Sequence, residues 1–438
     1  MMRKNFTKPA ILTILALFNY GCSTDIEKTG SFNILNNVSK PKPSVDNRLL
    51  LGGSSSVLEQ TKDAFSHPSN KLSPEELTKF LEGEEFFDET WQVATSVSKE
   101  RDGLGTFFNG ASCIVCHVAD GRGRPPRGGE VMESMLLRIS LPGHGSHNEP
   151  VPSNIYGDQL QGFAIPGVKP EAKVDISYQD IMGRYDDGEN YILKKPIYKI
   201  VNPEYGQLER GLMISPRVAN QMSGMGLMED IPERDILALN DPGDRDRDGI
   251  SGKANYVWDT EKQKFSLGRF GWKANQPSVR QQVAGAFSGD VGITTSIFPK
   301  ENYSDIQFKL LKKENTLSGG NPELENSDLD KVVVYSRNLS VPARRDINNP
   351  DVIAGERIFE QISCNKCHTI TMKSQGETIH PYTDLLLHDM GSDLADNRPD
   401  FMADGNEWRT PPLWTIGLFR TVNDHTNYLH DGRANNLT

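Results

Sequence analysis

The sequence predicts a mainly α-helical protein in which two small helical domains flank a long, mostly irregular insertion with short strands. Three observations support this fold class. One five-residue motif occurs twice, at 113–117 and at 364–368, and signals for a helix precede each copy. Between the copies, residues 149–345 lack the sustained periodicity that a helical domain would show.

Each motif has the form Cys-x-x-Cys-His, and together they hold four of the five cysteines in 438 residues. In such a motif the two thiols can bond to the vinyl groups of a haem, and the histidine becomes the proximal iron ligand. Zinc sites also use cysteine pairs, but they do not require a histidine directly after each pair. We therefore expect two cytochrome c-like domains, each with one c-type haem. The expected haem-binding residues are Cys113, Cys116, His117, Cys364, Cys367 and His368.

The N-terminus has the pattern of a bacterial export signal. Three basic residues within the first eight precede an apolar run at 10–18, which is too short to cross a bilayer comfortably. Cys22 follows this run where a lipoprotein signal would place its lipidated cysteine, although cleavage at another position is an alternative. We expect a signal peptide over 1–22 and a location in the periplasm, with membrane attachment only through lipid on Cys22.

Composition divides the rest of the chain. Residues 23–71 are rich in Ser, Asn, Lys, Pro and Gly, which predicts a flexible linker. We expect part of the N-terminal haem domain at 72–148, the insertion at 149–345 and the C-terminal cytochrome c domain at 346–438. The formal net charge of −11 argues against nucleic acid as a partner and suits a basic redox protein.

Local signals place several elements. Ser73-Pro-Glu-Glu76 combines an N-cap serine, a proline at the first helical position and a glutamate at the third, which predicts a helix start. A second helix is expected after Asn349-Pro350, with apolar residues at helical spacing up to Cys364. Within the insertion, residues 191–201 and 331–335 are rich in residues that favour strands.

Other polar residues are possible contacts of the haems. Arginines in the basic loop at 120–129 could pair with haem propionates, or could simply be exposed. No spacing rule identifies a distal iron ligand. On residue type alone the possible distal ligands are His144, His147, His380, His388, Met390 and His430.

A short acidic loop has features of a calcium site. Asp244, Asp246 and Asp248 alternate with arginines and precede Gly249, so their carboxylates could converge on a hard cation. The glutamate expected at the twelfth position of such a loop is replaced by Asn255. An acidic turn balanced by its own arginines is the alternative.

Four longer segments, together with both motifs, closely resemble the di-haem oxidoreductase family, whose members are labelled thiol oxidoreductases or peroxidases. The resemblance runs from about residue 72 to the end, and the family is distantly similar to bacterial di-haem cytochrome c peroxidases. The "thiol" label gains no support from the residues, because no cysteine remains for a redox-active dithiol. The four segments are 268–274, 381–391, 407–414 and 429–434.

The resemblance implies that peroxide reacts at the N-terminal haem, that electrons enter at the C-terminal haem and that a tryptophan lies between them. By pattern, Trp272, Gln282 and Asp290 correspond to that tryptophan and to the polar side chains above the peroxide-binding iron. A carboxylate there could move a proton between the two peroxide oxygens. Asp290 stands where the family has glutamate, and Trp272 could instead be a core aromatic.

The resemblance also bears on the second haem. The family continues past 429–434 into a His-Gly-Gly motif that could supply a distal ligand, whereas the given sequence stops at Thr438. We expect either a truncated C-terminus or a ligand from elsewhere, with Met390 and His388 the next candidates.

These observations predict a periplasmic di-haem oxidoreductase, with peroxidase activity as the leading hypothesis. Its electron donor would be a small redox protein of the cytochrome c or cupredoxin type. Two alternatives remain open: an electron-transfer cytochrome without a substrate, and an oxidase of a protein or thiol substrate.

Overall fold

The computed structural model describes residues 48–97, 101–127 and 130–437. These residues belong to one compact unit, Val45–Thr438. The expected signal peptide, Cys22 and the first part of the expected linker, up to residue 47, lie outside the described residues.

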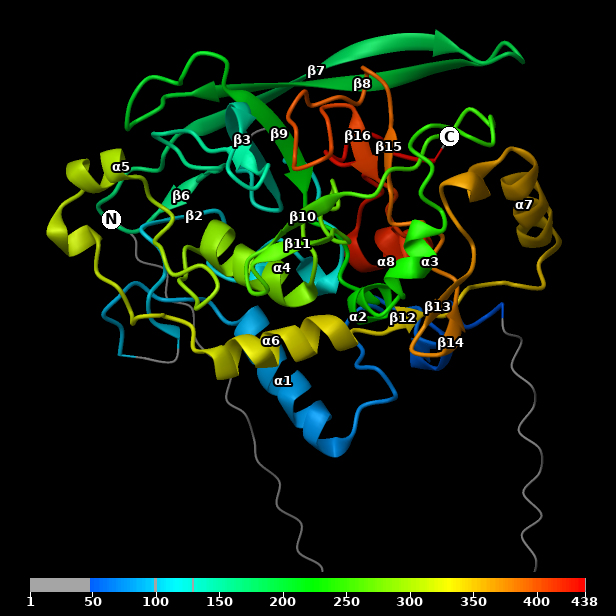
Figure 1. Cartoon of the computed structure of the whole chain (residues 1–438), viewed down its shortest axis with the longest axis horizontal. Helices are drawn as coiled ribbons and strands as arrows, with labels where there is room; N and C mark the ends of the chain where they lie inside the picture. Colours follow the sequence, from blue (N-terminus) through cyan, green and yellow to red (C-terminus); the bar gives the residue numbers. More distant parts are fainter. Residues whose placement is uncertain (1–47, 98–100, 128–129, 438) are drawn as a thin grey trace, which may run out of the picture. The chain divides into compact units, whose positions relative to one another are not determined.

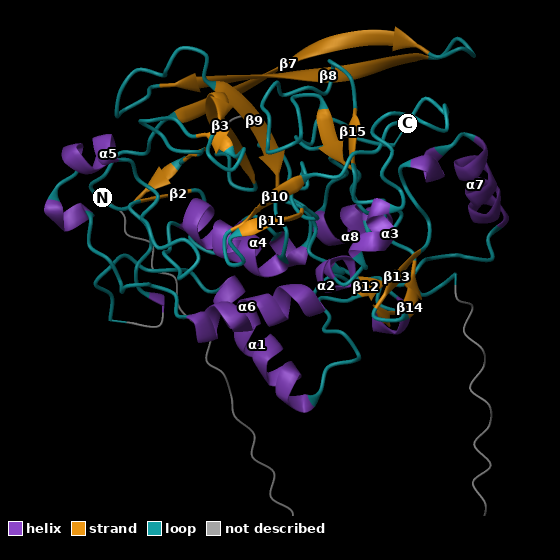
Figure 2. Ribbon diagram, in the orientation of Figure 1, coloured by secondary structure: helices purple, strands orange, loops and turns teal. Residues whose placement is uncertain are grey.

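The expectation of a mainly α-helical fold is wrong. Among the described residues, helices make up 24% and strands 23%, in eight helices and several small sheets (Figure 2). The error lies mostly in the insertion at 149–345, which contains long strands rather than mostly irregular chain. The β-branched and aromatic residues of these strands occur in short runs, which favour strands without any helical periodicity.

Two crossed helices, α1 (Pro74–Asp88) and α6 (Asn326–Asn338), lie together at the lower side of Figure 1. The predicted start of α1 is confirmed: the Ser73 hydroxyl and the Glu76 carboxylate cap each other's backbone amides. The helices approach closely at Gly83, where a Cβ atom would lie 2.2 Å from the Lys331 carbonyl oxygen. Only glycine therefore permits this crossing.

Residues 331–335 belong to α6, so the strand expected there is wrong. Leu329, Val332, Tyr335 and Ser336 are buried at helical spacing, on the side that faces the core. Burial of this face outweighs the strand preference of the valines in the segment.

A four-stranded sheet is centred on β3 (Met135–His144), which pairs with β4 (Pro150–Val151), β5 (Gln159–Leu160) and β9 (Met213–Val218). Beside it, β7 (Lys173–Arg184) and β8 (Asn190–Val201) form a long antiparallel hairpin along the top of Figure 1. The strand predicted at 191–201 is confirmed.

The expected linker is folded over its described part, 48–71, so that expectation is wrong there. β1 (Ser56–Val57) pairs in parallel with β12 (Val341–Pro342), and Phe65 is fully buried against Phe419. The polar composition predicted a flexible linker, but single apolar side chains anchor this segment to distant parts of the chain.

The C-terminal region begins with α7 (Pro350–Gln361), which confirms the predicted helix before the second motif. Two hairpins follow, β13 (Met372–Ser374) with β14 (Glu377–Ile379) and β15 (Leu387–Asp389) with β16 (Glu407–Arg409). The remaining elements are α2 (Met225–Glu229), α3 (Glu233–Leu237), α4 (Val279–Ala286), α5 (Asp305–Leu310), α8 (Phe419–Asn423), β2 (Phe107–Phe108), β6 (Phe163–Ala164), β10 (Tyr256–Asp259) and β11 (Lys264–Leu267).

The largest hydrophobic core joins residues of α1, α2, α4 and α6, and Cys113 packs against it. Among the described residues, no helix combines the length and apolar character needed to cross a membrane.

Candidate functional site

The first motif is held against a π-helical turn that follows α4. Cys113–Val115 forms a short 3-10 turn, and the loop before it donates two backbone hydrogen bonds, from Asn109 and Gly110, to the carbonyl oxygen of Asp290. These bonds, 2.7 and 3.1 Å long, fix the loop beside the turn Phe287–Val291. The motif and Asp290 are therefore positioned by the same backbone contacts.

The ring of His117 is oriented for metal binding. Its Nδ1 lies 2.7 Å from the carbonyl oxygen of Asn220. Because a carbonyl can only accept, Nδ1 must carry the proton, which leaves the lone pair of Nε2 available to a metal. Burial lowers the pKa of His117 and keeps the ring neutral, as a ligand must be.

The second motif repeats this geometry. His368 Nδ1 lies 2.8 Å from the carbonyl oxygen of Tyr382, and burial lowers the pKa of His368. The motif follows α7, and Phe359 of that helix lies against both the His368 and Tyr382 rings. Both histidines therefore have the tautomer that a haem iron requires.

The first motif opens into a cavity with about 1450 Å³ of empty space, including its mouth. Cys113, Cys116 and His117 line it. Much of the remaining wall is apolar, which suits a porphyrin. The apolar lining includes Phe87, Met135, Met222, Met225, Met228, Phe270, Val283 and Val332.

The thiols of the first motif are protonated and unreactive in this setting. Burial, followed by the nearby Asp290 carboxylate, raises the pKa of Cys113 to about 12 and raises that of Cys116 further. All four motif cysteines are free of disulfides. A thiol-based redox centre needs a lowered pKa, so this environment argues against such a centre.

Gln282 and Asp290, the two side chains expected above the iron, line the same cavity. Asp290 accepts a 2.6 Å hydrogen bond from the Gln159 amide, and burial raises its pKa although Arg138 and Gln159 oppose the shift. Gln282 is half-buried on α4. The structure therefore brings a half-buried carboxyl group and a polar amide to the wall of this cavity.

Trp272 also lines the cavity and is 5% exposed. Its indole nitrogen donates to the carbonyl oxygen of Val218 at 2.8 Å, and its ring packs in a cluster with Trp408. The Arg122 guanidinium lies 5.0 Å from the centre of the Trp272 ring. Trp272 is thus a core aromatic that also forms part of the site.

The arginines on the cavity wall were not expected from the sequence. Arg138, Arg217 and Arg409 line the cavity. In the basic loop, Arg122 donates to the carbonyls of Asn427 and Leu429, and none of the loop's arginines lines the cavity. The three lining arginines are far apart in sequence, so no local pattern could have identified them.

Hydrogen bonds connect the cavity wall to the second motif. The Arg409 amide donates to the carbonyl oxygen of Trp272 at 2.8 Å. The next residue, Thr410, accepts a 2.6 Å bond from the Thr383 hydroxyl, and the Thr383 amide donates to Thr369. Thr369 directly follows His368, so a short bonded route joins the two sites.

The two candidate distal ligands of the second haem differ in position. His388 is buried, with Nδ1 3.5 Å from Cys367 Sγ and Nε2 2.7 Å from the Asp384 carboxylate. Burial disfavours the charged imidazolium, but the bonds to Asp384 and Cys367 outweigh it and raise the pKa of His388 to about 10. Met390, just past β15, is 49% exposed. Of these two side chains, His388 is the one with a contact to the motif.

Of the other four histidines considered from the sequence, three contact a neighbouring side chain and one is exposed. His430 stacks on Trp408 with ring centres 3.7 Å apart, and burial lowers its pKa to about 4. His147 stacks on Trp258 in the same way. His380 lies 3.3 Å from the Thr371 hydroxyl, whereas His144 is exposed.

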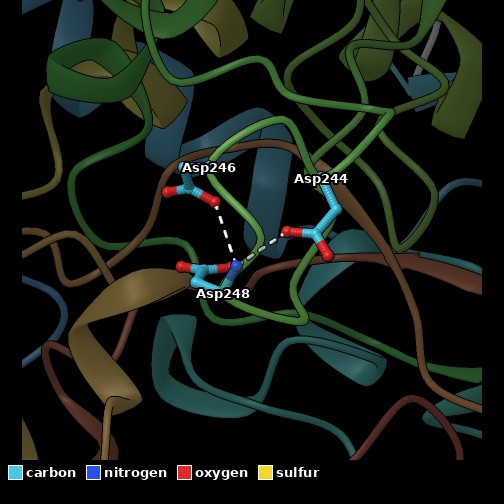
Figure 3. Close-up of side chains that lie close together, drawn as sticks. All are labelled: Asp244, Asp246 and Asp248. Carbon is cyan, nitrogen blue, oxygen red and sulfur yellow. Dashed lines mark hydrogen bonds between the residues drawn. The ribbon is translucent and has the colours of Figure 1, made fainter.

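The acidic loop brings its three carboxylates together, with ligand oxygens of Asp244, Asp246 and Asp248 within 4.8 Å of one another (Figure 3). The Asp248 amide donates to Asp244 and to Asp246. Lys366, inside the second motif, pairs with Asp248 at 2.9 Å and lowers its pKa. The loop therefore contacts the second motif through one ion pair.

Comparison with known proteins identifies the family of the chain. The family model described as "Di-haem oxidoreductase, putative peroxidase" matches residues 50–438. No curated protein and no solved structure matches the chain. The family match covers most of the sequence and includes both Cys-x-x-Cys-His motifs. The chain therefore belongs to the di-haem oxidoreductase family.

Proposed function

We propose that this di-haem oxidoreductase is a periplasmic peroxidase with two c-type haems, and that it reduces hydrogen peroxide with electrons from a small cytochrome c or cupredoxin. The observation that carries the proposal is the position of Asp290. Its carboxyl group lines the same cavity as Cys113, Cys116 and His117. An electron-transfer cytochrome has no need of an acid on the wall of this cavity.

A haem held at the first motif supplies the redox-active iron for peroxide chemistry. Asp290 then has the task of a general base and acid, which takes the proton from one peroxide oxygen and returns it to the other. The Gln159 amide, 2.6 Å from Oδ1, orients the carboxyl group. Burial raises the pKa of Asp290, which makes it a better proton acceptor than an exposed aspartate.

Arg138 and Gln282 complete the polar part of the wall. Arg138 is anchored by Asp158 at 2.8 Å, so its guanidinium has a fixed orientation. A fixed cation and an amide donor can stabilise negative charge on a peroxide oxygen as it develops. We propose that these two side chains bind and polarise the substrate.

Electrons would enter at the second motif and pass to the first. Trp272 lines the first cavity, and its backbone is joined to the second motif through Arg409, Thr410 and Thr383. We propose Trp272 as part of this route, and His388 as the closer candidate for the distal position of the second haem. To bind an iron, His388 would have to lose the proton that Asp384 stabilises; Nε2–H would then donate to Asp384, and Nδ1 would be left for the iron.

Replacement of Asp290 by asparagine tests the proposal. D290N keeps the size of the side chain but removes the base, so peroxide reduction should fall by roughly 10²–10⁴-fold. Glu171→Gln is the matched control, because Glu171 is another acid with a raised pKa, is buried and does not line the cavity. Steady-state rates with a reduced cytochrome c as donor provide the measurement.

Equal rates in D290N and the parent protein would contradict the assigned role. If neither protein consumes peroxide and both exchange electrons with the donor, the electron-transfer cytochrome is favoured. If the haems react with peroxide but only a protein or thiol substrate is oxidised, the third hypothesis is favoured.

We further propose that the loop Asp244–Asp248 binds calcium and that lipid on Cys22 anchors the protein to a membrane. Three clustered carboxylates suit calcium, and the Lys366 ion pair would transmit its binding to the second haem. Calorimetric titration with calcium, compared between the parent protein and Asp246→Asn, tests the first point. Incorporation of labelled palmitate, with Cys22→Ser as control, tests the second.

A further inference from the structure

Tyr335 is a buried tyrosine that the peroxidase mechanism leaves without a role. It lies on α6 and is 1% exposed. Its hydroxyl donates a 2.6 Å hydrogen bond to Oδ1 of Asp120, which is also buried. The pair is a phenol with a carboxylate as its proton acceptor, enclosed in the core.

Aromatic contacts connect this pair to the first site. The Phe87 ring lies 5.1 Å from the Tyr335 ring and 6.1 Å from the His117 ring, measured between centres. Phe87 lines the cavity, and so do Val332 and Ser336 on either side of Tyr335 in α6. One phenyl ring therefore separates the phenol from the proximal histidine.

The backbone after His117 places Asp120 beneath α6. Ala119 and Asp120 both have positive φ, at 51° and 57°, so the chain turns sharply directly after the motif. Non-glycine residues adopt this conformation rarely, and two in succession are unusual. This unfavourable backbone conformation places a carboxylate next to the Tyr335 hydroxyl.

The charges around the aromatic residues near the site favour oxidation of Tyr335. The Arg122 guanidinium lies 5.0 Å from the Trp272 ring centre, and the Lys273 ammonium lies 4.5 Å from that of Trp408. A nearby cation makes removal of an electron from a ring more costly. Tyr335 is instead influenced by carboxylates, those of Asp120, Glu84 and Asp88.

We propose that Tyr335 is a redox-active residue that supplies an electron to the first site when peroxide has reacted and no donor protein is bound. The inference rests on the proposed peroxide chemistry. Tyr335 would then act as an internal reductant. Oxidation of its ring would replace oxidation of side chains on the cavity wall.

The step is balanced by the groups present. Hydrogen peroxide is the oxidant, and the oxidised centre at His117 receives one electron from the Tyr335 ring. The phenolic O–H bond breaks, and the proton moves along the existing hydrogen bond to Oδ1 of Asp120. The products are a neutral tyrosyl radical, a protonated Asp120 carboxyl group and a centre reduced by one electron.

Electron paramagnetic resonance of the haem-loaded protein tests this inference. The fully ferric protein is mixed with hydrogen peroxide without donor and frozen within seconds, in parallel with a sample oxidised by photogenerated tris(bipyridine)ruthenium(III). We expect an organic radical signal that narrows when the protein contains ring-deuterated tyrosine. The signal should be lost in Tyr335→Phe and be weaker in Asp120→Asn, whose amide can accept the hydrogen bond but is not a base.

Tyr156→Phe is the matched control. Tyr156 is equally buried, but its hydroxyl donates to the carbonyl oxygen of Gly206 and it does not line the cavity. A radical that persists unchanged in Tyr335→Phe, or one insensitive to tyrosine deuteration, would overturn the inference. If peroxide leaves the haem spectra unchanged, the proposed function fails, and the ruthenium sample still decides whether Tyr335 is the residue oxidised.

Discussion

The two Cys-x-x-Cys-His motifs share a sequence pattern and a histidine geometry, but their surroundings differ. The first lies on a cavity whose walls come from α1, α2, α4, α6, β3 and β9. The second follows α7, in which no residue is fully buried and Ile358 is 52% exposed. The cysteines of both motifs are half-buried, but the first motif packs against the main core and the second follows an exposed helix.

This difference shows that the motif specifies a cofactor and the surroundings specify its use. A half-buried carboxyl group, Asp290, lines the first site and suits proton transfer to a small substrate. The second site has His388 against Cys367 and an exposed helix before it, which suits a six-coordinate haem that receives electrons from a partner.

Replacement of each proximal histidine should have the largest and most unequal effects. In His117→Ala the first iron loses its ligand, so peroxide consumption should fall to background. In His368→Ala the first site remains intact, so a single turnover with chemically reduced protein should survive while turnover with a donor protein is lost. Stopped-flow absorbance at the haem bands distinguishes these outcomes.

Equal loss of the single turnover in both variants would contradict the proposed difference between the two sites. The two sites would then act as one unit, and the division between substrate chemistry and electron entry would be wrong. Haem content measured for each variant controls for loss of the cofactor itself.

Glu171 is a buried acid that does not line the cavity, so it tests the effect of burial alone. Burial raises the pKa of Glu171 to about 8, although the Gln161 amide and the Gln307 side chain donate to it. The folded state therefore binds a proton that the unfolded state releases above its own pKa, near 4.5. Stability is fully present below pH 4.5 and is lost as the pH rises to about 8.

Between pH 5 and pH 8 this group should lower the free energy of unfolding by on the order of 3 kcal/mol. Glu171→Gln should remove this part of the pH dependence without an effect on peroxide reduction. Urea unfolding at several pH values measures it. An unchanged pH profile in the variant would show that Glu171 is ionised in the folded protein.

A glycine in the helix before each motif offers a matched pair of substitutions. Gly83→Ala in α1 places a Cβ atom 2.2 Å from the Lys331 carbonyl oxygen, so α1 and α6 must separate. We expect a loss of about 1–3 kcal/mol in stability and a changed spectrum of the first haem. Thermal unfolding and low-temperature spin resonance provide the measurements, and an unchanged melting temperature would show that the crossing is loose.

Gly355→Ala in α7 should have the smallest effect and the opposite sign. No atom lies within 4 Å of the added Cβ, and glycine in a helix costs about 0.5–1 kcal/mol relative to alanine. The variant should therefore melt at a slightly higher temperature, with both haem spectra unchanged. Destabilisation would show that α7 is covered in the native protein.

The features that could be predicted from the sequence are local ones. The cap at Ser73, the helix start at Asn349-Pro350 and the strand at 191–201 each depend on neighbours in the chain. The two motifs are also local, because five adjacent residues supply both thiols and the histidine of each site.

The features that could not be predicted depend on distant contacts. Residues 331–335 are helical because α1 packs against them, and 48–71 is folded because Phe65 reaches Phe419. Arg138, Arg217 and Arg409 meet at the cavity only through the sheet and the C-terminal hairpin. The family resemblance did locate Trp272, Gln282 and Asp290, which the structure brings to one cavity, although their roles remain a proposal.

The most direct measurement is addition of hydrogen peroxide to the half-reduced, haem-loaded protein, followed by optical and low-temperature spin resonance spectra. If the two sites differ as proposed, the haem at Cys113–His117 is high-spin and reacts within seconds, and the haem at Cys364–His368 is low-spin and becomes oxidised. If both haems are low-spin and peroxide causes only slow bleaching, the protein is an electron carrier and the peroxidase proposal is contradicted.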